Sequence, residues 1–227
     1  MTNLKQNIRQ VRQAIVAIGF HPAPDKITIL GSGFISGGKI ISAAHLLNGL
    51  TQEQIAGLKA NVMVAQQGDI ENYHWLSIKL DKHEPKDDLA VFTAEYDLNQ
   101  LPNLKLGDSE SVEIGQDVYF IGFPYAAQLI NDGFGITLVA NKGMVSNIKR
   151  DGADPNHKRN WFIIDAISNP GNSGCPVINA ETNEVIGVMS ISFRTKSQVK
   201  GFEELEIREP MHIAGAKPIN LVKELLK

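Results

Sequence analysis

The sequence predicts an all-β protein of two packed barrels with a helix at each end, and three observations lead to this prediction. Most of the chain consists of strand-length apolar runs separated by Gly, Asn, Asp and Pro, such as "KITILG", "NVMVAQ" and "WFIIDA". Few helical periods intervene between these runs. The loop-rich link "NQLPNLKLGDSESVEIGQ", residues 99–116, divides the runs into two sets. Short strands of this kind are typical of a β-sandwich or β-barrel.

Apolar residues at the start of the chain follow a helical spacing. Leu4, Ile8, Val11, Ile15 and Ile18 are separated by 4, 3, 4 and 3 positions, so they would share one face of a helix. We interpret residues 1–24 as an amphipathic helix and a linker that contains the extended break "HPAP". The helix either packs on the body of the protein or docks to a partner or a second copy.

The two sets of runs define the remaining organisation. We assign residues 25–110 to a first β-barrel and residues 111–227 to a second. "KPINLVKELLK" predicts a C-terminal helix, because Pro218 can start a helix and the residues after it have an apolar side. The charged segment 193–210 is predicted to be a surface hairpin, with a regulatory or substrate-selecting loop as the alternative.

Composition restricts the class of protein. The chain has 227 residues, 43% hydrophobic and 21% charged, with a net charge of −3, so nothing favours nucleic acid or an anionic membrane as a partner. No apolar run approaches the roughly 18 residues that span a bilayer, and the N-terminus lacks the features of a signal peptide. A single cysteine excludes an intrachain disulfide, and we therefore predict a cytoplasmic location.

A serine, a histidine and an aspartate, which can act together in catalysis, occur beside apolar strands or in a glycine-rich turn. Ser173 lies in "NPGNSGCPV", where it is either a serine in a glycine-rich turn or a nucleophile. His45 follows an apolar strand in "IISAAHLLNG", and is either a structural histidine or a base. Asp87 and Asp88 precede the strand "LAVF", and composition alone does not choose between them.

The order of these residues points to one chemistry. Serine is a poor nucleophile at neutral pH unless a base takes its proton and a third group orients that base. A histidine, an aspartate and a serine follow one another here on a chain that predicts two β-barrels, which is one known arrangement of such a triad. Gly171 and Gly174 would give the serine turn its conformational freedom. The N–H groups of Gly171 and Ser173 could then stabilise a developing oxyanion.

These motifs resemble those of chymotrypsin-fold serine proteases, most of all the protease domain of the bacterial high-temperature-requirement (Deg-type) group. The similarity covers residues 26–227 and rests on "GSGFI", "ISAAH", "DLAVF", "DAISNPGNSGCPV", "VIGVMSIS" and "KPINLVKELL". It implies two six-stranded antiparallel barrels. It also implies a serine endopeptidase that acts on proteins or peptides and uses no metal or other cofactor.

The resemblance assigns roles at the matched positions. Ser173 would be the nucleophile, His45 the general base and acid, and Asp88, chosen over Asp87, the orienting carboxylate. The oxyanion hole would be the N–H groups of Gly171 and Ser173. A catalytically latent or inactive module that binds proteins through the same fold is the alternative, although no member of the triad is missing.

The resemblance also implies a substrate site. Ser190 would support the aspartate, and the strand edge Ser190–Ser192, which includes Ile191, would pair with the substrate backbone. Ile167 and Ser168 would form the base of the first specificity pocket, with Ser192 at its wall and Gly215 nearby. Because no acid lies at that base, we expect cleavage after small or medium apolar residues.

The sequence differs from the Deg-type group in two features. Cys175 stands where glycine is usual, and we interpret it as a small buried residue, with an oxidisable thiol as the alternative. The peptide-binding domain typical of the group has no counterpart in this sequence. We therefore expect a freestanding cytoplasmic peptidase that acts with or without a separate partner.

Overall fold

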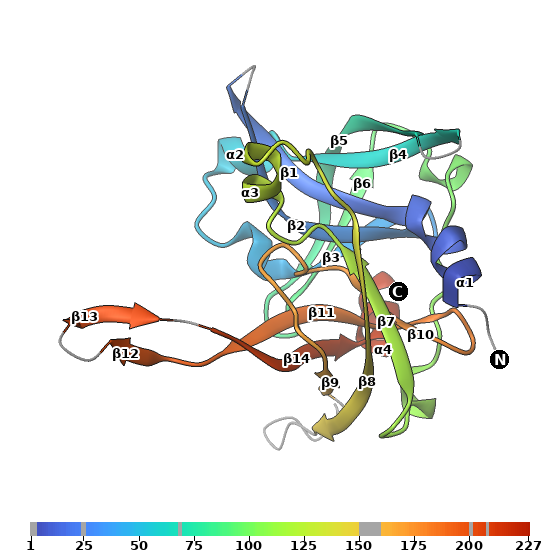
Figure 1. Ribbon diagram of the computed structural model, residues 1–227. Coiled ribbons are helices and arrows are strands. Elements are labelled where there is room, and N and C mark those ends of the chain that lie inside the picture. The colour runs from blue at the N-terminus through green and yellow to red at the C-terminus, as the bar shows by residue number, and fades with distance from the viewer. Residues whose placement is uncertain (1–3, 24–25, 68–69, 150–159, 200–201, 208) are drawn as a thin grey trace.

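Strands from the two halves of the chain close into two β-barrels, which lie one above the other in Figure 1. This computed structural model describes residues 4–23, 26–67, 70–149, 160–199, 202–207 and 209–227. Each barrel has six antiparallel strands, which confirms the predicted fold class.

The first barrel is formed by the N-terminal half of the chain. Its strands follow the order β1-β2-β3-β6-β5-β4, and β1 pairs with β4 to close it. The bounds are β1 Ile15–Ala23, β2 Lys26–Ser36, β3 Lys39–Ser42, β4 Lys59–Gln67, β5 Ile70–Glu84 and β6 Leu89–Ala94. The runs "KITILG" and "GSGFIS", which look like two strands in the sequence, form the single long strand β2.

The second barrel follows the order β10-β11-β14-β9-β8-β7, and β7 pairs with β10 to close it. The bounds are β7 Asp117–Gly122, β8 Val139–Lys149, β9 Trp161–Asp165, β10 Pro176–Asn179, β11 Val185–Arg194 and β14 Pro210–Pro218. Between β11 and β14, strands β12 (Ser197–Val199) and β13 (Phe202–Ile207) pair as a hairpin that projects away from both barrels (Figure 1).

The N-terminal helix is shorter than predicted. Helix α1 spans Leu4–Val11, a 3₁₀ turn η1 spans Arg12–Ala14, and the next residues already form β1. The prediction that Ile15 and Ile18 continue the helix was wrong. The run "IVAI" is rich in β-branched residues, which favour strands, and it is fully buried between β2 and β4. The first barrel therefore begins at Ile15 rather than at residue 25.

Helix α1 packs on the body of the protein. Leu4 and Ile8 contact the buried core, and Val11 is part of it. The Asn7 side-chain amide donates to the Ala180 carbonyl at 3.0 Å. These contacts favour the packed interpretation, and docking of a partner through α1 stays a prediction.

The remaining helices are short and lie at the ends of strands. Helix α4 (Ile219–Leu226) ends the chain and matches the C-terminal helix expected from Pro218 onward. The other elements are α2 Gln52–Ala56, α3 Ala126–Asn131, and the 3₁₀ turns η2 Ala44–Leu47, η3 Leu98–Gln100 and η4 Ser109–Ser111. Within the described ranges, no helix has both the length and the apolar character needed to cross a membrane.

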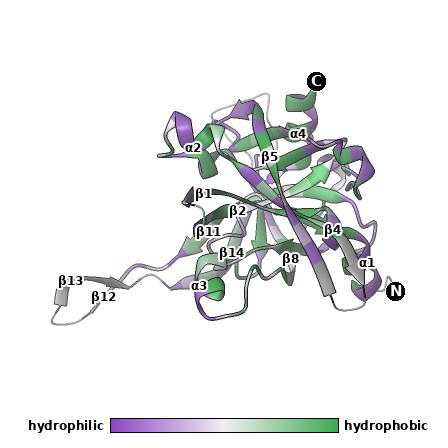
Figure 2. Ribbon diagram, turned by 90° about the horizontal axis from the view of Figure 1, so that it is seen from above, coloured by the Kyte–Doolittle hydropathy of each residue, from purple (hydrophilic) through white to green (hydrophobic). Residues whose placement is uncertain are grey.

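Buried apolar side chains fill both barrels and the space between them. One cluster joins residues of the first barrel, such as Phe34 and Phe92, to residues of the second, such as Tyr119 and Ile178. A second cluster, around Phe120 and Phe162, lies on the opposite face of the second barrel's sheet, because residues of β7 alternate between the two clusters. In Figure 2, which colours each residue by hydropathy, strands β1 and β2 are mostly hydrophobic and parts of helix α2 are hydrophilic. The continuous cluster holds the two barrels against each other.

Candidate functional site

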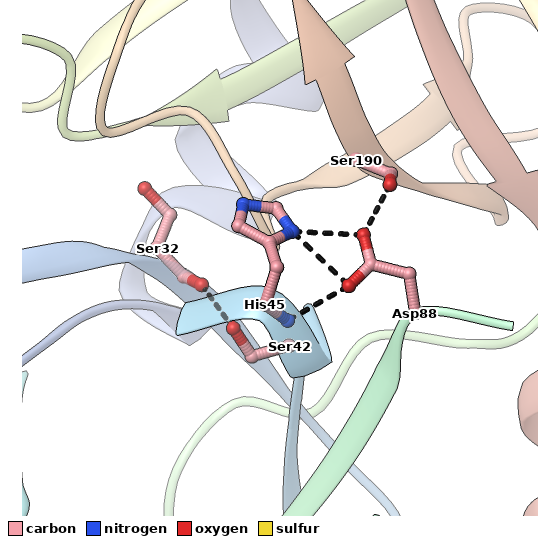
Figure 3. Close-up of polar contacts among 5 residues, drawn as sticks. All are labelled: Ser32, Ser42, His45, Asp88 and Ser190. Atoms are coloured by element: carbon pink, nitrogen blue, oxygen red, sulfur yellow. Dashed lines mark hydrogen bonds and ion pairs between the residues drawn. The ribbon is translucent and has the colours of Figure 1, made fainter. Parts of the chain in front are cut away.

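The end of strand β3 places His45 against Asp88. Strand β3 runs into the 3₁₀ turn η2, whose first residues face the turn that precedes β6. The Ala44 N–H donates to the Asp88 carbonyl at 3.1 Å, and the His45 N–H donates to Asp88 Oδ1 at 2.8 Å. His45 Nδ1 lies 3.0 Å from Oδ1 and 2.8 Å from Oδ2 of the same carboxylate (Figure 3). Backbone and side-chain contacts therefore fix the imidazole against Asp88.

These contacts determine which imidazole nitrogen is free. A carboxylate only accepts hydrogen bonds, so the contact requires the proton of His45 on Nδ1. In the neutral ring, Nε2 then carries the lone pair, which is the form that a general base needs. The His45 side chain is 36% exposed, so a substrate can reach this ring.

Asp88 has an unusual backbone and a third partner. Its φ of +54° lies in the left-handed region, which costs energy for a residue with a side chain. The Ser190 hydroxyl on β11 also donates to Asp88 Oδ2 (Figure 3). Burial raises the pKa of Asp88, but hydrogen bonds with His45 and Ser190 outweigh it and hold the pKa below its ordinary value. The carboxylate is therefore charged at neutral pH.

The loop that carries Ser173 is held through its carbonyl groups. The Gly171 carbonyl accepts from the Ser32 hydroxyl at 2.6 Å, and the Ser173 carbonyl accepts from the Ser32 N–H at 2.8 Å. The Pro170 carbonyl accepts from the Tyr125 N–H at 2.7 Å. In the described part of the chain, the N–H groups of Gly171 and Ser173 donate to no acceptor. The loop thus leaves two backbone donors available.

Two glycines make this loop conformation possible. Gly171 has φ +100° and Gly174 has φ +84°, a region that residues with side chains rarely adopt. A Cβ on Gly171 would lie 2.3 Å from the Phe123 carbonyl oxygen. A Cβ on Gly174 would lie 2.1 Å from the Ser42 hydroxyl. Both positions therefore exclude any larger residue.

Ser173 is half-buried on this loop. Among the described residues, no hydrogen bond joins Ser173 to His45. Hydrogen bonds of this kind are often long in proteins without substrate and shorten when substrate binds. The structure thus joins His45, Asp88 and Ser190 directly, and connects Ser173 to the first barrel through Ser32.

The residues predicted for the specificity pocket lie on three segments, namely the loop after β9, strand β11 and strand β14. Ser168 is buried on the loop that follows β9, and Ile167 beside it is half-buried. The Ser192 hydroxyl on β11 donates to the Ser168 carbonyl at 2.6 Å. Ile191 pairs with Gly215 of β14, and the residue is 41% exposed. Ile167 and Ser168 therefore lie on the same loop as Ser173, between β9 and β10, and Ser192 contacts that loop.

Sequence reasoning gave no role to Ser32, which the structure places at the centre of these contacts. Its hydroxyl also accepts the Phe123 N–H at 2.9 Å, and its carbonyl accepts the Ser42 hydroxyl at 2.6 Å (Figure 3). Ser32 is fully buried. The available signal was a polar residue between the two glycines of "GSGFI", but nothing in the sequence shows which distant backbone groups it meets.

Other groups near the site do not extend it. Cys175 is fully buried, and burial raises the pKa of its thiol, as expected for a small packed residue. Across the described ranges, no three His, Cys, Asp or Glu side chains gather to bind a metal ion.

A cavity of about 280 Å³ adjoins Gly171 on the side of Ile29, Leu30 and the start of α3.

Comparison with known proteins identifies the family. Residues 31–188 match the model of the trypsin-like peptidase domain. The chain is 34% identical, over 82% of its length, to a "Probable periplasmic serine endoprotease DegP-like" of Halomonas elongata, and 32% identical, over 75%, to "Protease Do-like 5, chloroplastic" of Arabidopsis thaliana. It spans 33% of the former protein and 50% of the latter.

A solved structure shows the same fold. The "HtrA-type protease AlgW with decapeptide" superposes with a TM-score of 0.70 at 20% identity, over 99% of this chain and 66% of that one. This likeness supports the two-barrel architecture described above.

The relatives correct one prediction. We predicted a cytoplasmic location, and this was wrong, because relatives from Halomonas elongata and Pseudomonas species are named periplasmic endoproteases. The prediction depended on the absence of disulfides, and an exported protein can also lack them.

The family model, the curated relatives and the shared fold agree with one another and with the resemblance found in the sequence. The chain belongs to the trypsin-like peptidase domain family, and it is similar to the DegP-like and HtrA-type proteases named above.

Proposed function

We propose that this chain hydrolyses peptide bonds with Ser173 as nucleophile, His45 as general base and Asp88 as the residue that orients His45. The N–H groups of Gly171 and Ser173 form the oxyanion hole. The observation that carries this proposal is that these two N–H groups have no acceptor in the described part of the chain, while the carbonyls around them are all bound. A tetrahedral oxyanion is stabilised by backbone N–H groups that lie beside the serine and donate to no other acceptor.

The reaction proceeds in two half-reactions. Ser173 Oγ attacks the carbonyl carbon of the scissile bond, and His45 Nε2 takes the hydroxyl proton. The carbonyl oxygen becomes an oxyanion that accepts hydrogen bonds from Gly171 and Ser173. His45 then gives its proton to the leaving amine, and the C–N bond breaks to leave an ester on Ser173. Water, activated by the same imidazole, hydrolyses the ester and frees the serine.

Asp88 and Ser190 act through His45. The carboxylate keeps the proton on Nδ1 and stabilises the imidazolium that forms during attack. Ser190 donates to Oδ2 and so helps to hold the carboxylate in place. The lowered pKa of Asp88 keeps this residue charged throughout the pH range in which proteases of this kind act.

The substrate is a protein or peptide. The strand edge Ser190–Ser192 pairs with its backbone, and residues Ile167, Ser168 and Ser192 receive a small or medium apolar side chain before the cut. A related structure contains a bound decapeptide, which supports a peptide as substrate. We further propose a periplasmic location, from the names of the relatives.

An alkyl fluorophosphonate probe tests the proposal, because it reacts with activated serines and needs no knowledge of the substrate. We expect the wild-type protein to be labelled, and Ser173→Ala and His45→Ala to lose the label. Asp88→Asn should label at least about a hundredfold more slowly, because the imidazole loses its oriented tautomer. Asp87→Asn is the matched control and should label like wild type.

The alternative function predicts a different outcome. A folded wild-type protein that takes no label would indicate a protein-binding module with the protease fold and would overturn the proposed catalysis. Equal loss of labelling in Asp87→Asn and Asp88→Asn would overturn the role of Asp88 alone.

A further inference from the structure

A cavity of about 310 Å³ lies on the first barrel, between the end of strand β1 and helix α2 (Figure 1). Strand β1 supplies one wall of this cavity with Phe20, His21 and Pro22. The His21 ring stands edge-on against the ring of Trp75, with 5.3 Å between the ring centres, and this contact holds its position. The wall therefore consists mainly of ring carbon atoms, on which an aliphatic chain can pack.

Helix α2 and its N-cap supply the other wall. The Thr51 N–H donates to Gln54 Oε1 at 2.9 Å, and the Gln54 N–H donates to Thr51 Oγ1 at 3.2 Å, so these two side chains bind to the helix itself. Glu53 also lines the cavity, and its exposed carboxylate forms no hydrogen bond or ion pair within the described part of the chain. The Glu53 carboxylate is therefore available to a ligand.

An apolar wall together with an available carboxylate fits a lysine or arginine side chain. Such a side chain packs its methylene groups on apolar surface and keeps its charged end among polar groups. The side chain of an acidic residue would instead meet the Glu53 carboxylate at close range, and like charges repel. Charge complementarity thus favours a basic occupant.

Strand β2 connects this cavity to the candidate site. The Ser32 N–H on β2 donates to the Ser173 carbonyl, and Thr28, four residues earlier on the same strand, pairs with Phe20 at the cavity. Because a strand rises about 3.3 Å per residue, an extended peptide covers this interval with about four residues. The turn η2, which carries the proposed general acid His45, also directly precedes α2 in the chain. The part of a substrate that follows the cut can therefore reach the cavity.

We propose that this cavity binds a lysine or arginine side chain of the substrate, about four residues after the cut, with Glu53 as its charge partner. The inference rests on the proposed peptidase function and deepens it, because it names a second feature of the substrate. The cavity is remote from the reacting bonds. We therefore expect the preference in substrate affinity and in KM, with little change in kcat.

Pairs of peptides measure this preference. Each peptide has about twelve residues, valine before the intended cut and no other charged side chain, and it carries either lysine or norleucine at one variable position. Norleucine keeps the aliphatic part of lysine and lacks its ammonium group. The variable position lies three, four or five residues after the cut in successive pairs.

Binding is followed in a protein with Ser173→Ala and Trp161→Phe, which does not cut the peptide. Trp75, whose ring contacts His21 of the cavity, is then the remaining tryptophan, and its fluorescence reports the bound peptide. For at least one placement, the dissociation constant of the lysine peptide should be about two- to fivefold lower than that of the norleucine peptide, the range for one exposed ion pair.

Variants of Glu53 in the same protein isolate the charge. Glu53→Gln should bring the ratio of the two dissociation constants to about one. Glu53→Lys should reverse the preference, toward a third peptide with glutamate at the same position. Glu113→Gln is the matched control, because Glu113 is also exposed and lines a different cavity, on the second barrel. Its ratio should equal that of the protein with both glutamates.

The outcomes separate this inference from the proposed function. If the wild-type protein takes no alkyl fluorophosphonate label, the peptidase function fails and the inference about its substrate fails with it. If wild type is labelled, but lysine and norleucine peptides bind alike at every placement or neither binds, only the inference is overturned. A ratio that Glu53→Gln leaves unchanged overturns it as well. If Trp161→Phe does not fold, the KM values of wild type and Glu53→Gln for the same peptides decide.

Discussion

At the scale of single residues, the candidate site depends on one carboxylate with several partners. Asp88 accepts the His45 backbone N–H, the His45 ring and the Ser190 hydroxyl, and it adopts a left-handed backbone to do so. These contacts all favour the charged form. The residue is therefore a source of folding stability as well as the proposed orienting group.

This carboxylate makes the stability of the wild-type protein depend on pH in a defined way, and replacing it removes that dependence. A carboxyl group whose pKa is lower in the folded state stabilises the fold above its unfolded pKa, about 3.9, and loses that effect as pH falls through the folded pKa. Wild type should therefore exceed Asp88→Asn in unfolding free energy by a constant amount above about pH 4.

The difference should shrink below that pH, as measured by chemical denaturation between pH 3 and pH 7. Asp87→Asn provides the matched control and should show no such trend. A difference between wild type and Asp88→Asn that stays constant down to pH 3 would contradict the lowered pKa.

At the scale of elements, strand β2 of the first barrel holds the loop of the second barrel that carries Ser173. Ser32 contacts this loop through both its N–H and its hydroxyl, and the same hydroxyl accepts the N–H of Phe123, which directly follows β7. The start of α3 contributes the Tyr125 N–H on the other side. The proposed oxyanion hole is thus assembled by segments that are far apart in sequence.

Removing the Ser32 hydroxyl should impair this assembly. Ser32→Ala leaves the Gly171 carbonyl and the Phe123 N–H without their partner, so we expect a loss of about 1–3 kcal/mol in unfolding free energy. Because Gly171 is then less firmly held, fluorophosphonate labelling should slow by about a hundredfold, the effect of losing one oxyanion donor.

Ser36→Ala is the control, because Ser36 is another buried serine of β2 that donates to a carbonyl. It should lose similar stability but keep its labelling rate. If both variants label equally, Ser32 has only a structural role.

At the scale of the whole molecule, the two barrels share buried contacts. A single cluster of buried apolar residues includes members of both barrels. The Lys82 ammonium on β5 also donates to the Leu225 carbonyl at 2.6 Å, which ties the first barrel to the C-terminal helix that follows the second. Separation of the barrels would expose this shared surface, so it should not occur without unfolding.

The two tryptophans allow this expectation to be measured, because the chain has one in each barrel. Trp75 lies on β5 and Trp161 on β9, so Trp75→Phe leaves a probe of the second barrel and Trp161→Phe a probe of the first. In each variant, urea unfolding followed by fluorescence and by far-ultraviolet circular dichroism should give the same midpoint. Different midpoints in either variant would mean that the barrels unfold separately.

The sequence by itself determined the all-β architecture and the identity of the residues at the candidate site. Strand runs bounded by turn residues are local signals, so they can be recognised one segment at a time. The motifs around His45, Asp88 and Ser173 are likewise contiguous, so the resemblance to a protease family could assign each candidate residue from its own motif. Without that resemblance, the sequence left Asp87 and Asp88 as alternatives. The helical spacing of Ile15 and Ile18 was misleading, because burial between two strands outweighed a periodicity that both conformations allow.

Only the tertiary structure decided how distant groups meet. The hydrogen bonds from Ser32 to the loop of Ser173 join residues 139 and 141 positions apart, and the contact between Ser192 and Ser168 joins residues on two different segments. A serine hydroxyl can form hydrogen bonds with many kinds of group, so the neighbouring sequence does not indicate which group is its partner. Closure of the two barrels determines the partner, because it fixes which backbone groups are buried next to one another. Buried backbone groups need hydrogen-bond partners.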